Sequence, residues 1–160
     1  MARFARMLPI FLVALLFSGL FLLPASAGKT EVPVSWTVTG SEIAPGRVWT
    51  SIENGVEIRH TRRIELFVTV FGDFESLTTV VMDSDIAVAT GNGTHRGNLM
   101  LETADGTLTG QFRGTTHGAV LVGTYKANQG TGAFEKKQIK ASYSGTSYAF
   151  LELAFTGFLS

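Results

Sequence analysis

Apolar and polar residues alternate along most of the chain with a period of two, which is the pattern of β-strands that bury one face. The longest example lies between residues 56 and 71. Its even positions carry the apolar side chains Val56, Ile58, Ile64, Leu66, Val68 and Val70. Charged side chains occupy odd positions 57, 59, 63 and 65, so the even face is predicted to point inward.

Similar segments recur at short intervals through the rest of the chain. Further strands are predicted at 32–38, 47–53, 77–89, 96–103, 107–115, 118–125, 138–144 and 148–159. The dipeptides Asn54-Gly55 and Asp105-Gly106 favour tight two-residue hairpin turns, and Ser144-Gly145 is expected to form the turn before the last strand. Both faces of that last strand carry aromatic side chains, so the pattern does not determine which face is inward.

These strands, without any segment of helical period, predict an all-β protein. We expect a single antiparallel closed β-barrel of about eight strands, with a β-sandwich as the alternative. Gly110 and Gly114 alternate with Leu108 and Phe112, and small residues alternating with large ones suit the interior of a small barrel. Closure would also remove the exposed strand edges through which such chains aggregate.

Residues 1–27 have the organisation of a secretory signal peptide. Arg3 and Arg6 precede an apolar run over 7–23, and the segment 25–27 reads Ala-Ser-Ala, which suits a cleavage site. A membrane anchor is the alternative, because the run approaches the roughly 20 residues that span a bilayer. We expect cleavage after Ala27, a single barrel domain over 28–160, and a secreted or periplasmic protein with no membrane span after cleavage.

Charge and cysteine content narrow the class of protein further. The chain has 13 basic and 13 acidic residues, and loss of Arg3 and Arg6 with the signal leaves a formal charge near −2 (11 minus 13). Nucleic acid is therefore not an expected partner, since its binding needs a concentrated basic surface. Cysteine is absent, so stability must come from a core and not from disulfides.

A glycine-rich stretch near the C-terminus suggests close contact between backbone segments, because Gly130 and Gly132 precede the lone aromatic Phe134. The pattern over 130–135, Gly-Thr-Gly-Ala-Phe-Glu, together with the closing segment 148–153, resembles the corresponding stretch of the allene oxide cyclase and dirigent families. The chain is also similar to small secreted bacterial barrel domains of unknown function, through the glycine repeat over 106–114. The resemblance covers roughly residues 92–160.

This resemblance implies an eight-stranded antiparallel barrel with a mostly apolar lumen. In characterised relatives the lumen holds a fatty-acid epoxide for cyclisation, or steers the coupling of phenoxy radicals. Those families usually have a glycine shortly after the phenylalanine, whereas Lys136 and Lys137 follow Glu135 here. The residues that position substrate in the cyclases come largely from the amino-terminal half, which has no match here. No catalytic residue is therefore transferred.

His60 and Arg62 interrupt the inward face of the strand over 56–71. An inward arginine must pair with an acid or line a wet cavity, because an unpaired charge in an apolar interior is costly. One interpretation is that Arg62 binds a carboxylate ligand while His60 acts as a hydrogen-bond partner or general base. The alternative is a β-bulge between Ile58 and Ile64 that turns both side chains outward, or a position at the barrel rim.

The other polar candidates are weaker. Glu152 in the last strand is a further candidate for a ligand-binding carboxylate. His95 and His117 lie beside glycines, so we interpret both as solvated loop residues, and their spacing does not suggest a metal site. Asp83 and Asp85 share a strand face that is expected to be exposed. No metal or cofactor is expected.

We therefore predict a barrel that binds a small apolar or amphipathic ligand in or at the mouth of its lumen. An isomerase or cyclase like the relatives is one alternative, and it needs a polar group deep in the lumen. An envelope or matrix interaction module is another. That module would be a possible homo-oligomer that uses the outer aromatics Phe67, Phe71 and Tyr125.

Overall fold

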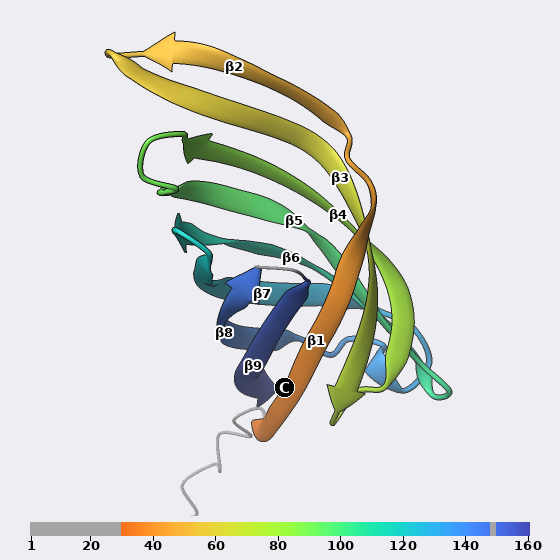
Figure 1. Ribbon diagram of the computed structural model, residues 1–160. Helices are drawn as coiled ribbons and strands as arrows, with labels where there is room; N and C mark the ends of the chain where they lie inside the picture. The colour runs from red at the N-terminus through yellow and green to blue at the C-terminus, as the bar shows by residue number, and fades with distance from the viewer. Residues whose placement is uncertain (1–29, 148–149) are drawn as a thin grey trace, which may run out of the picture.

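The computed structural model describes residues 30–147 and 150–160, so the predicted signal peptide lies outside the described residues. These residues form nine antiparallel strands, eight of which close into a barrel while one is extra, as the alternation of the sequence predicts (Figure 1). The strands are β1 (Val32–Ala44), β2 (Arg47–Glu53), β3 (Val56–Gly72), β4 (Ser76–Ala87), β5 (Gly93–Thr103), β6 (Gly106–His117), β7 (Val120–Gly130), β8 (Ile139–Ser147) and β9 (Leu151–Leu159). A short 3-10 helix, η1 (Gly132–Phe134), joins β7 to β8.

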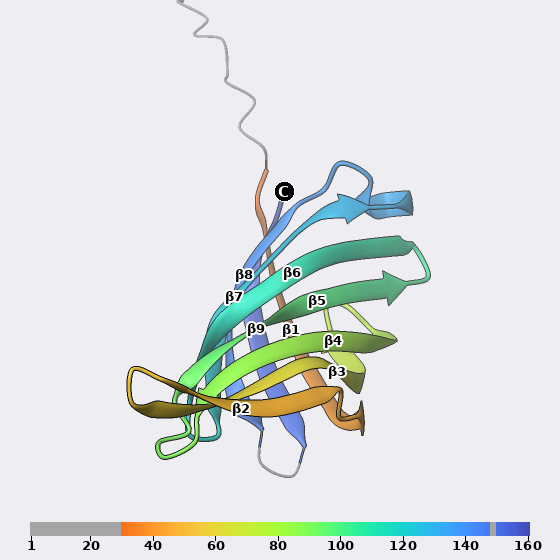
Figure 2. The same cartoon turned by 90° about the horizontal axis from the view of Figure 1, so that it is seen from above.

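The barrel closes through β1, which pairs with β9 along one edge and with β3 along the other. All other neighbours around the wall are consecutive strands from β3 to β9. The extra strand β2 continues from β1 and pairs with the first half of β3, so the β2–β3 hairpin extends the sheet beyond the closed barrel (Figures 1 and 2). Asn54 and Gly55 form its turn with φ angles of 50° and 81°, as their sequence predicts.

The barrel interior is filled by apolar and aromatic side chains from every strand except β2. Trp36 of β1 stacks on Phe155 of β9, with ring centroids 4.8 Å apart, and Tyr125 of β7 packs edge-on against both. Tyr125 is fully buried, so its expected position among the outer aromatics is wrong. Leu151, Leu153 and Phe155 point inward, which determines the face of β9 that the sequence left open.

Glycines make room for the largest interior side chains. A Cβ atom on Gly123 would meet the Tyr143 ring, and one on Gly114 would meet the Tyr143 hydroxyl. The two strands next to Tyr143, β7 and β6, therefore carry no side chain at these two positions, as expected where small residues alternate with large ones in a narrow barrel.

A bulge in β3 decides which face carries its polar residues. The pairing of β3 with β4 shifts register between Thr61 and Ile64, and Arg63 adopts a φ of 59°. Because the bulge adds a residue, Thr61 and Ile64 both face inward while His60 and Arg62 lie on the outer face. This is the bulge alternative that the sequence allowed, and it removes both residues from the lumen.

The glycine stretch around Gly130 links the barrel wall to the closing strands. A Cβ atom on Gly132 would meet the carbonyl oxygen of Asp105, so η1 lies against the turn between β5 and β6. The close backbone approach expected here is confirmed. In contrast, the turn expected at Ser144-Gly145 is wrong, because β8 continues through Ser147. In the described part of the chain, no helix is long and apolar enough to cross a membrane.

Candidate functional site

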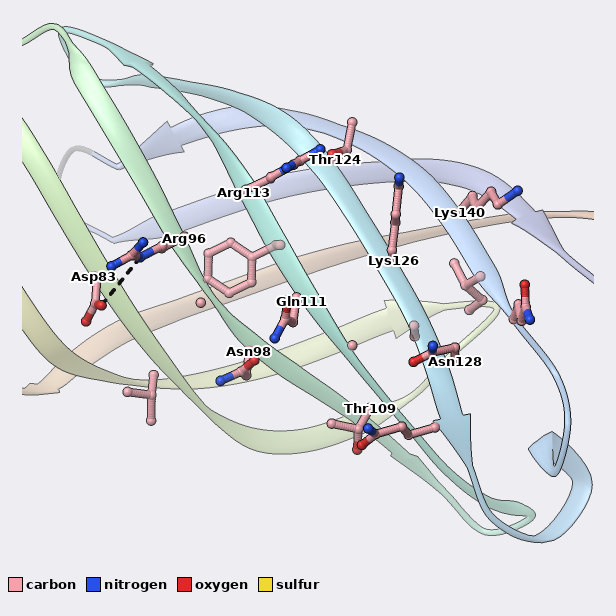
Figure 3. A pocket seen from close by; sticks show the side chains of 18 of the residues that line it. Asp83, Arg96, Asn98, Thr109, Gln111, Arg113, Thr124, Lys126, Asn128 and Lys140 are labelled. Carbon is pink, nitrogen blue, oxygen red and sulfur yellow. Dashed lines mark ion pairs between the residues drawn. The ribbon is translucent and has the colours of Figure 1, made fainter.

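A groove of about 1000 Å³ lies on the outer wall of the barrel. It crosses β4, β5, β6, β7 and β8, whose outward side chains form its floor, and Arg63 of β3 lies at its margin (Figure 3). The strands place these side chains in rows, since residues that pair across a sheet lie side by side on the same face. The rows of this groove are polar, in contrast to the inner face of the same strands.

Five basic side chains line the groove, and four of them face another basic side chain across neighbouring strands. The basic residues are Arg63, Arg96, Arg113, Lys126 and Lys140. In the sheet register Arg96 lies opposite Arg113, and Lys126 lies opposite Lys140. One acidic residue, Asp83, is among the lining residues, and its carboxylate is 3.6 Å from Nε of Arg96 (Figure 3). The groove therefore concentrates positive charge in a chain whose formal net charge is zero.

Like charges that face each other across two strands destabilise the sheet. Arg113, Lys126 and Lys140 are exposed, and 71% of the Arg96 side chain is accessible, so water screens the repulsion but does not remove it. The two neighbouring like-charge pairs thus destabilise the folded protein, and the barrel does not need these charges in order to form. An anion placed between them would convert that repulsion into attraction.

Neutral hydrogen-bonding groups surround the basic residues. Five amide side chains line the groove: Asn98, Gln111, Asn128, Gln129 and Gln138. Thr109 and Thr124 add hydroxyl groups. The aromatic residue among the described lining residues, Phe112, has its ring buried in the barrel core. The exposed lining can therefore pair with anionic groups and with hydroxyl groups, but it offers no aromatic face for stacking.

The lumen contains a second, much smaller polar arrangement. His95 of β5 is buried inside the barrel, with Nε2 2.7 Å from the Tyr143 hydroxyl and Nδ1 3.1 Å from Oγ1 of Thr116. Burial lowers the pKa of His95 to about 4, so its imidazole is neutral near pH 7. Burial also raises the pKa of Tyr143. The interpretation of His95 as a solvated loop residue is wrong, because β5 begins at Gly93 and carries His95 inward.

An apolar cavity of about 20 Å³ lies beside His95, between Met82, Phe112 and Phe155. That volume holds about one water-sized molecule. The lumen is thus packed by its own side chains, and a larger ligand would enter it only if core side chains moved.

His60 and Arg62 come together on the outer face of the β2–β3 extension, around Asp85 of β4. His60 Nδ1 and Arg62 Nη1 each lie 2.7 Å from Oδ1 of Asp85. Burial alone would raise the pKa of Asp85, but the hydrogen bonds from Arg62 and His60 outweigh it and hold that pKa below its usual value. Trp49 stacks on the His60 ring at 5.0 Å, and Arg47 and Arg62 lie over the Trp49 indole.

The remaining residues suggested by the sequence lie apart from these groups. Glu152 is exposed on the outer face of β9, opposite Thr39 and Thr146. Gly130, Gly132 and Phe134 have the structural position described above, with Phe134 packed against the core. Among the described residues, no three histidine, cysteine or acidic side chains form a group that could hold a metal ion.

Sequence reasoning missed the basic groove because its five basic residues come from five different strands. The signal that could have found it is the outward parity of Arg96, Arg113 and Lys126 in consecutive hairpin strands. The strand predicted over 96–103 begins too late to include His95, although His95 shares parity with Leu99 and Leu101.

No family model, curated protein or solved structure matches this chain, so the allene oxide cyclase and dirigent resemblance rests on its motif and on a compatible barrel fold.

Proposed function

We propose that this protein is a binding module whose outer groove holds a linear acidic polysaccharide. The observation that supports the proposal is the pair of adjacent like-charge contacts, Arg96 with Arg113 and Lys126 with Lys140, on one open face. Carboxylate or sulfate groups along a sugar chain would neutralise both pairs, while the surrounding amides bind its hydroxyl groups. This proposal develops the envelope or matrix alternative, in which the protein binds its ligand without converting it.

The composition of the groove favours a sugar polymer over nucleic acid. Proteins that bind single strands stack bases on aromatic side chains, and the exposed groove lining has none in the described residues. Amides such as Asn98 and Gln111 suit the many hydroxyl groups of a sugar. The groove is also open along the sheet, which accommodates a chain longer than the groove itself.

Isothermal titration at low salt tests the proposal, with polygalacturonate oligomers as the acidic probe, neutral dextran as the uncharged sugar and oligothymidylate as the nucleic acid. We expect binding to polygalacturonate alone, weakening as salt is raised. The double variant Lys126→Gln/Lys140→Gln should bind at least about tenfold more weakly, because it removes two charge-assisted contacts. Lys136→Gln/Lys137→Gln removes the same charge outside the groove and should bind like the parent protein.

Two results would count against this function. If oligothymidylate bound as tightly as polygalacturonate, the groove would be a general polyanion or nucleic-acid surface. If the two double variants weakened binding equally, the effect would come from net charge and not from the groove.

A small amphipathic ligand in the lumen is the second candidate. The neutral His95 and Tyr143 beside an apolar cavity support it, and binding would require core side chains to move. A cyclase or isomerase activity would depend on the same pair, which supplies the polar group that such chemistry needs. Native mass spectrometry tests this second candidate. The probes are short fatty acids of about four to twelve carbons. We expect a retained molecule that is lost in His95→Leu, and a protein that retains none of the acids would eliminate this candidate.

Export is part of the proposal, since an acidic polysaccharide is an extracellular ligand. The basic start, apolar run and Ala25–Ala27 exit support a cleaved signal peptide. Intact mass of the protein recovered outside the cytoplasm should correspond to a chain that begins at Gly28, and recovery of the uncleaved chain in membranes would instead indicate an anchor.

A further inference from the structure

The outer face of the β2–β3 extension brings together a serine, a histidine and an aspartate from three adjacent strands. Oγ of Ser51 on β2 lies 2.7 Å from Nε2 of His60 on β3. Nδ1 of the same ring lies 2.7 Å from Oδ1 of Asp85 on β4. The geometry points to a Ser51–His60–Asp85 catalytic triad that hydrolyses short-chain carboxylic esters, an activity that goes beyond the binding function and does not depend on it.

Each member has the position that its chemical role requires. A serine hydroxyl is a weak nucleophile until a base accepts its proton, and the base must hold the correct tautomer to do so. Asp85 accepts a hydrogen bond from Nδ1–H of His60, which leaves Nε2 free to accept the proton of Ser51. Trp49 stacked on the ring and Arg62 paired with Asp85 fix the two side chains in place.

The reaction uses water as its only co-reactant. Ser51 Oγ bonds to the ester carbonyl carbon while its proton passes to His60 Nε2, and the alcohol leaves with that proton as the C–O bond breaks. Water then attacks the acyl-serine, giving a proton to His60, and the carboxylic acid departs as Ser51 regains its proton. Asp85 stabilises the imidazolium in both steps and acts as a positioning residue.

The free edge of β2 supplies hydrogen-bond donors for the oxyanion. In a two-residue hairpin, the two residues that flank the turn exchange backbone hydrogen bonds, and every second pair beyond them does the same. The backbone groups of Glu53, Ser51 and Trp49 therefore hydrogen-bond to β3. The intervening N–H groups, including that of Ile52 directly after the nucleophile, point away from β3, where the described chain has no paired strand. An amide following a nucleophilic serine is a recurrent oxyanion donor.

The surroundings restrict the substrate to an accessible ester with a short acyl group. Ser51 is only partly buried, and the hollow of about 480 Å³ beside Trp49 and Arg62 is lined largely by the charged residues Arg47, Arg62, Arg63 and Glu65. Glu53 also approaches the site, with Oε1 3.1 Å from Ser51 Oγ and 3.3 Å from His60 Nε2. Because Glu53 accepts a hydrogen bond from the same hydroxyl, it competes with His60 for the Ser51 proton in the resting protein.

Hydrolysis of p-nitrophenyl acetate and labelling by a fluorophosphonate test the triad in the intact mature chain. The parent protein should be labelled at Ser51, identified by peptide mass, and should hydrolyse the ester above the buffer rate. Ser51→Ala should lose the label and at least about 100-fold in kcat/KM, the scale of one acid–base contribution. Ser144→Ala, an exposed serine on β8, should retain both. Asp85→Asn should lower kcat while leaving KM unchanged.

Glu53→Gln gives a second, independent readout. Removing the competing carboxylate while leaving the triad intact should preserve or increase kcat. Absence of a label at Ser51 in the folded parent protein would overturn the triad, as would ester hydrolysis that persists in Ser51→Ala. Neither result depends on the basic groove, since p-nitrophenyl acetate carries no anionic group.

Discussion

Lys126 and Lys140 show at the level of single residues how a binding surface can work against folding. They face each other on β7 and β8, beside the similar pair Arg96 and Arg113. Neither pair is required by the packing of the barrel, because all four side chains lie on the outer face. Stability measured without ligand should therefore improve when one of these charges is removed.

Replacement of Lys140 by Gln tests this expectation. It removes a direct like-charge contact, so the free energy of unfolding should rise by about 0.2–1 kcal/mol at low salt. The gain should shrink in high salt, where the repulsion is already screened. Urea denaturation at two salt concentrations measures it, with Lys137→Gln as the charge-matched control. Equal stabilisation by both variants would mean that net charge, and not the pair, is responsible.

His95 makes stability depend on pH in a defined window. Its pKa is about 4 in the folded protein against 6.5 for an unperturbed histidine, so the unfolded chain binds a proton more readily between these values. The contribution of His95 is therefore complete above pH 6.5 and is lost as the pH falls to about 4. This lowering of the His95 pKa corresponds to about 3 kcal/mol.

We expect His95→Gln to lose less stability than the parent protein between about pH 7 and pH 4.5, because a buried amide has no proton to gain. Urea denaturation across this range measures the difference. His117→Gln changes an exposed histidine at the end of β6 and should follow the parent curve. Parallel curves for the parent and His95→Gln would contradict a buried neutral imidazole at position 95.

The sequence alone did not show on which face of the barrel wall His60 and His95 lie. For His60 the alternation correctly indicated one continuous strand, but parity counted across a bulge assigns the opposite face. For His95 the adjacent glycines suggested a loop, although Gly97 lies in the interior row beside Phe112 and is part of the strand. In both cases the missing information is the pairing with a neighbouring strand, which local pattern does not contain.

At the scale of elements, the bulge in β3 determines what the strand displays. Its Arg63 adopts a φ of 59°, a left-handed conformation that costs a non-glycine residue about 1–2 kcal/mol. The backbone N–H of Arg63 donates to Oδ1 of Asp83, which helps to hold this geometry. Without the inserted residue, His60 and Arg62 would return to the interior parity that the sequence alone suggests.

The pair of variants Arg63→Gly and Arg63→Val separates this backbone effect from the loss of charge. Both lack the guanidinium, but valine is branched at Cβ and tolerates positive φ poorly, whereas glycine adopts it freely. Arg63→Val should therefore be less stable than Arg63→Gly by about 1–2 kcal/mol. Thermal unfolding compares them directly, and equal midpoints would show that the bulge relaxes around the substitution.

At the scale of the whole molecule, the sequence predicted an antiparallel barrel from the number of strands, the hairpin dipeptides and the alternation of small with large residues. This prediction is confirmed. Asn54-Gly55 and Asp105-Gly106 determine two turns because both dipeptides end in a glycine that accepts positive φ locally. Closure through β1 and β3 and the extra strand β2 did not follow, since both depend on residues far apart in the chain. The groove depends on the same long-range order, so it could not be located before the fold was known.

The extra strand β2 has a consequence for the motions of the molecule. Within the described residues, barrel strands pair on both edges, whereas β2 pairs on one edge only and contributes no residue to the buried core. Segments with few buried contacts open locally without global unfolding. Amide hydrogens of β2 should therefore exchange with solvent at least about 100-fold faster than those of β7, as measured by hydrogen exchange and NMR.

Comparable protection of β2 and β7 would mean that the two strands open together with the barrel. If β2 opens alone, Ser51 separates from His60 while the wall that carries His60 and Asp85 stays folded. The fraction of molecules with a complete Ser51–His60–Asp85 arrangement would then equal the fraction in which β2 is docked. A ligand, a partner or a temperature change that shifts the docking of this one strand would set the level of activity while the barrel itself remains unchanged.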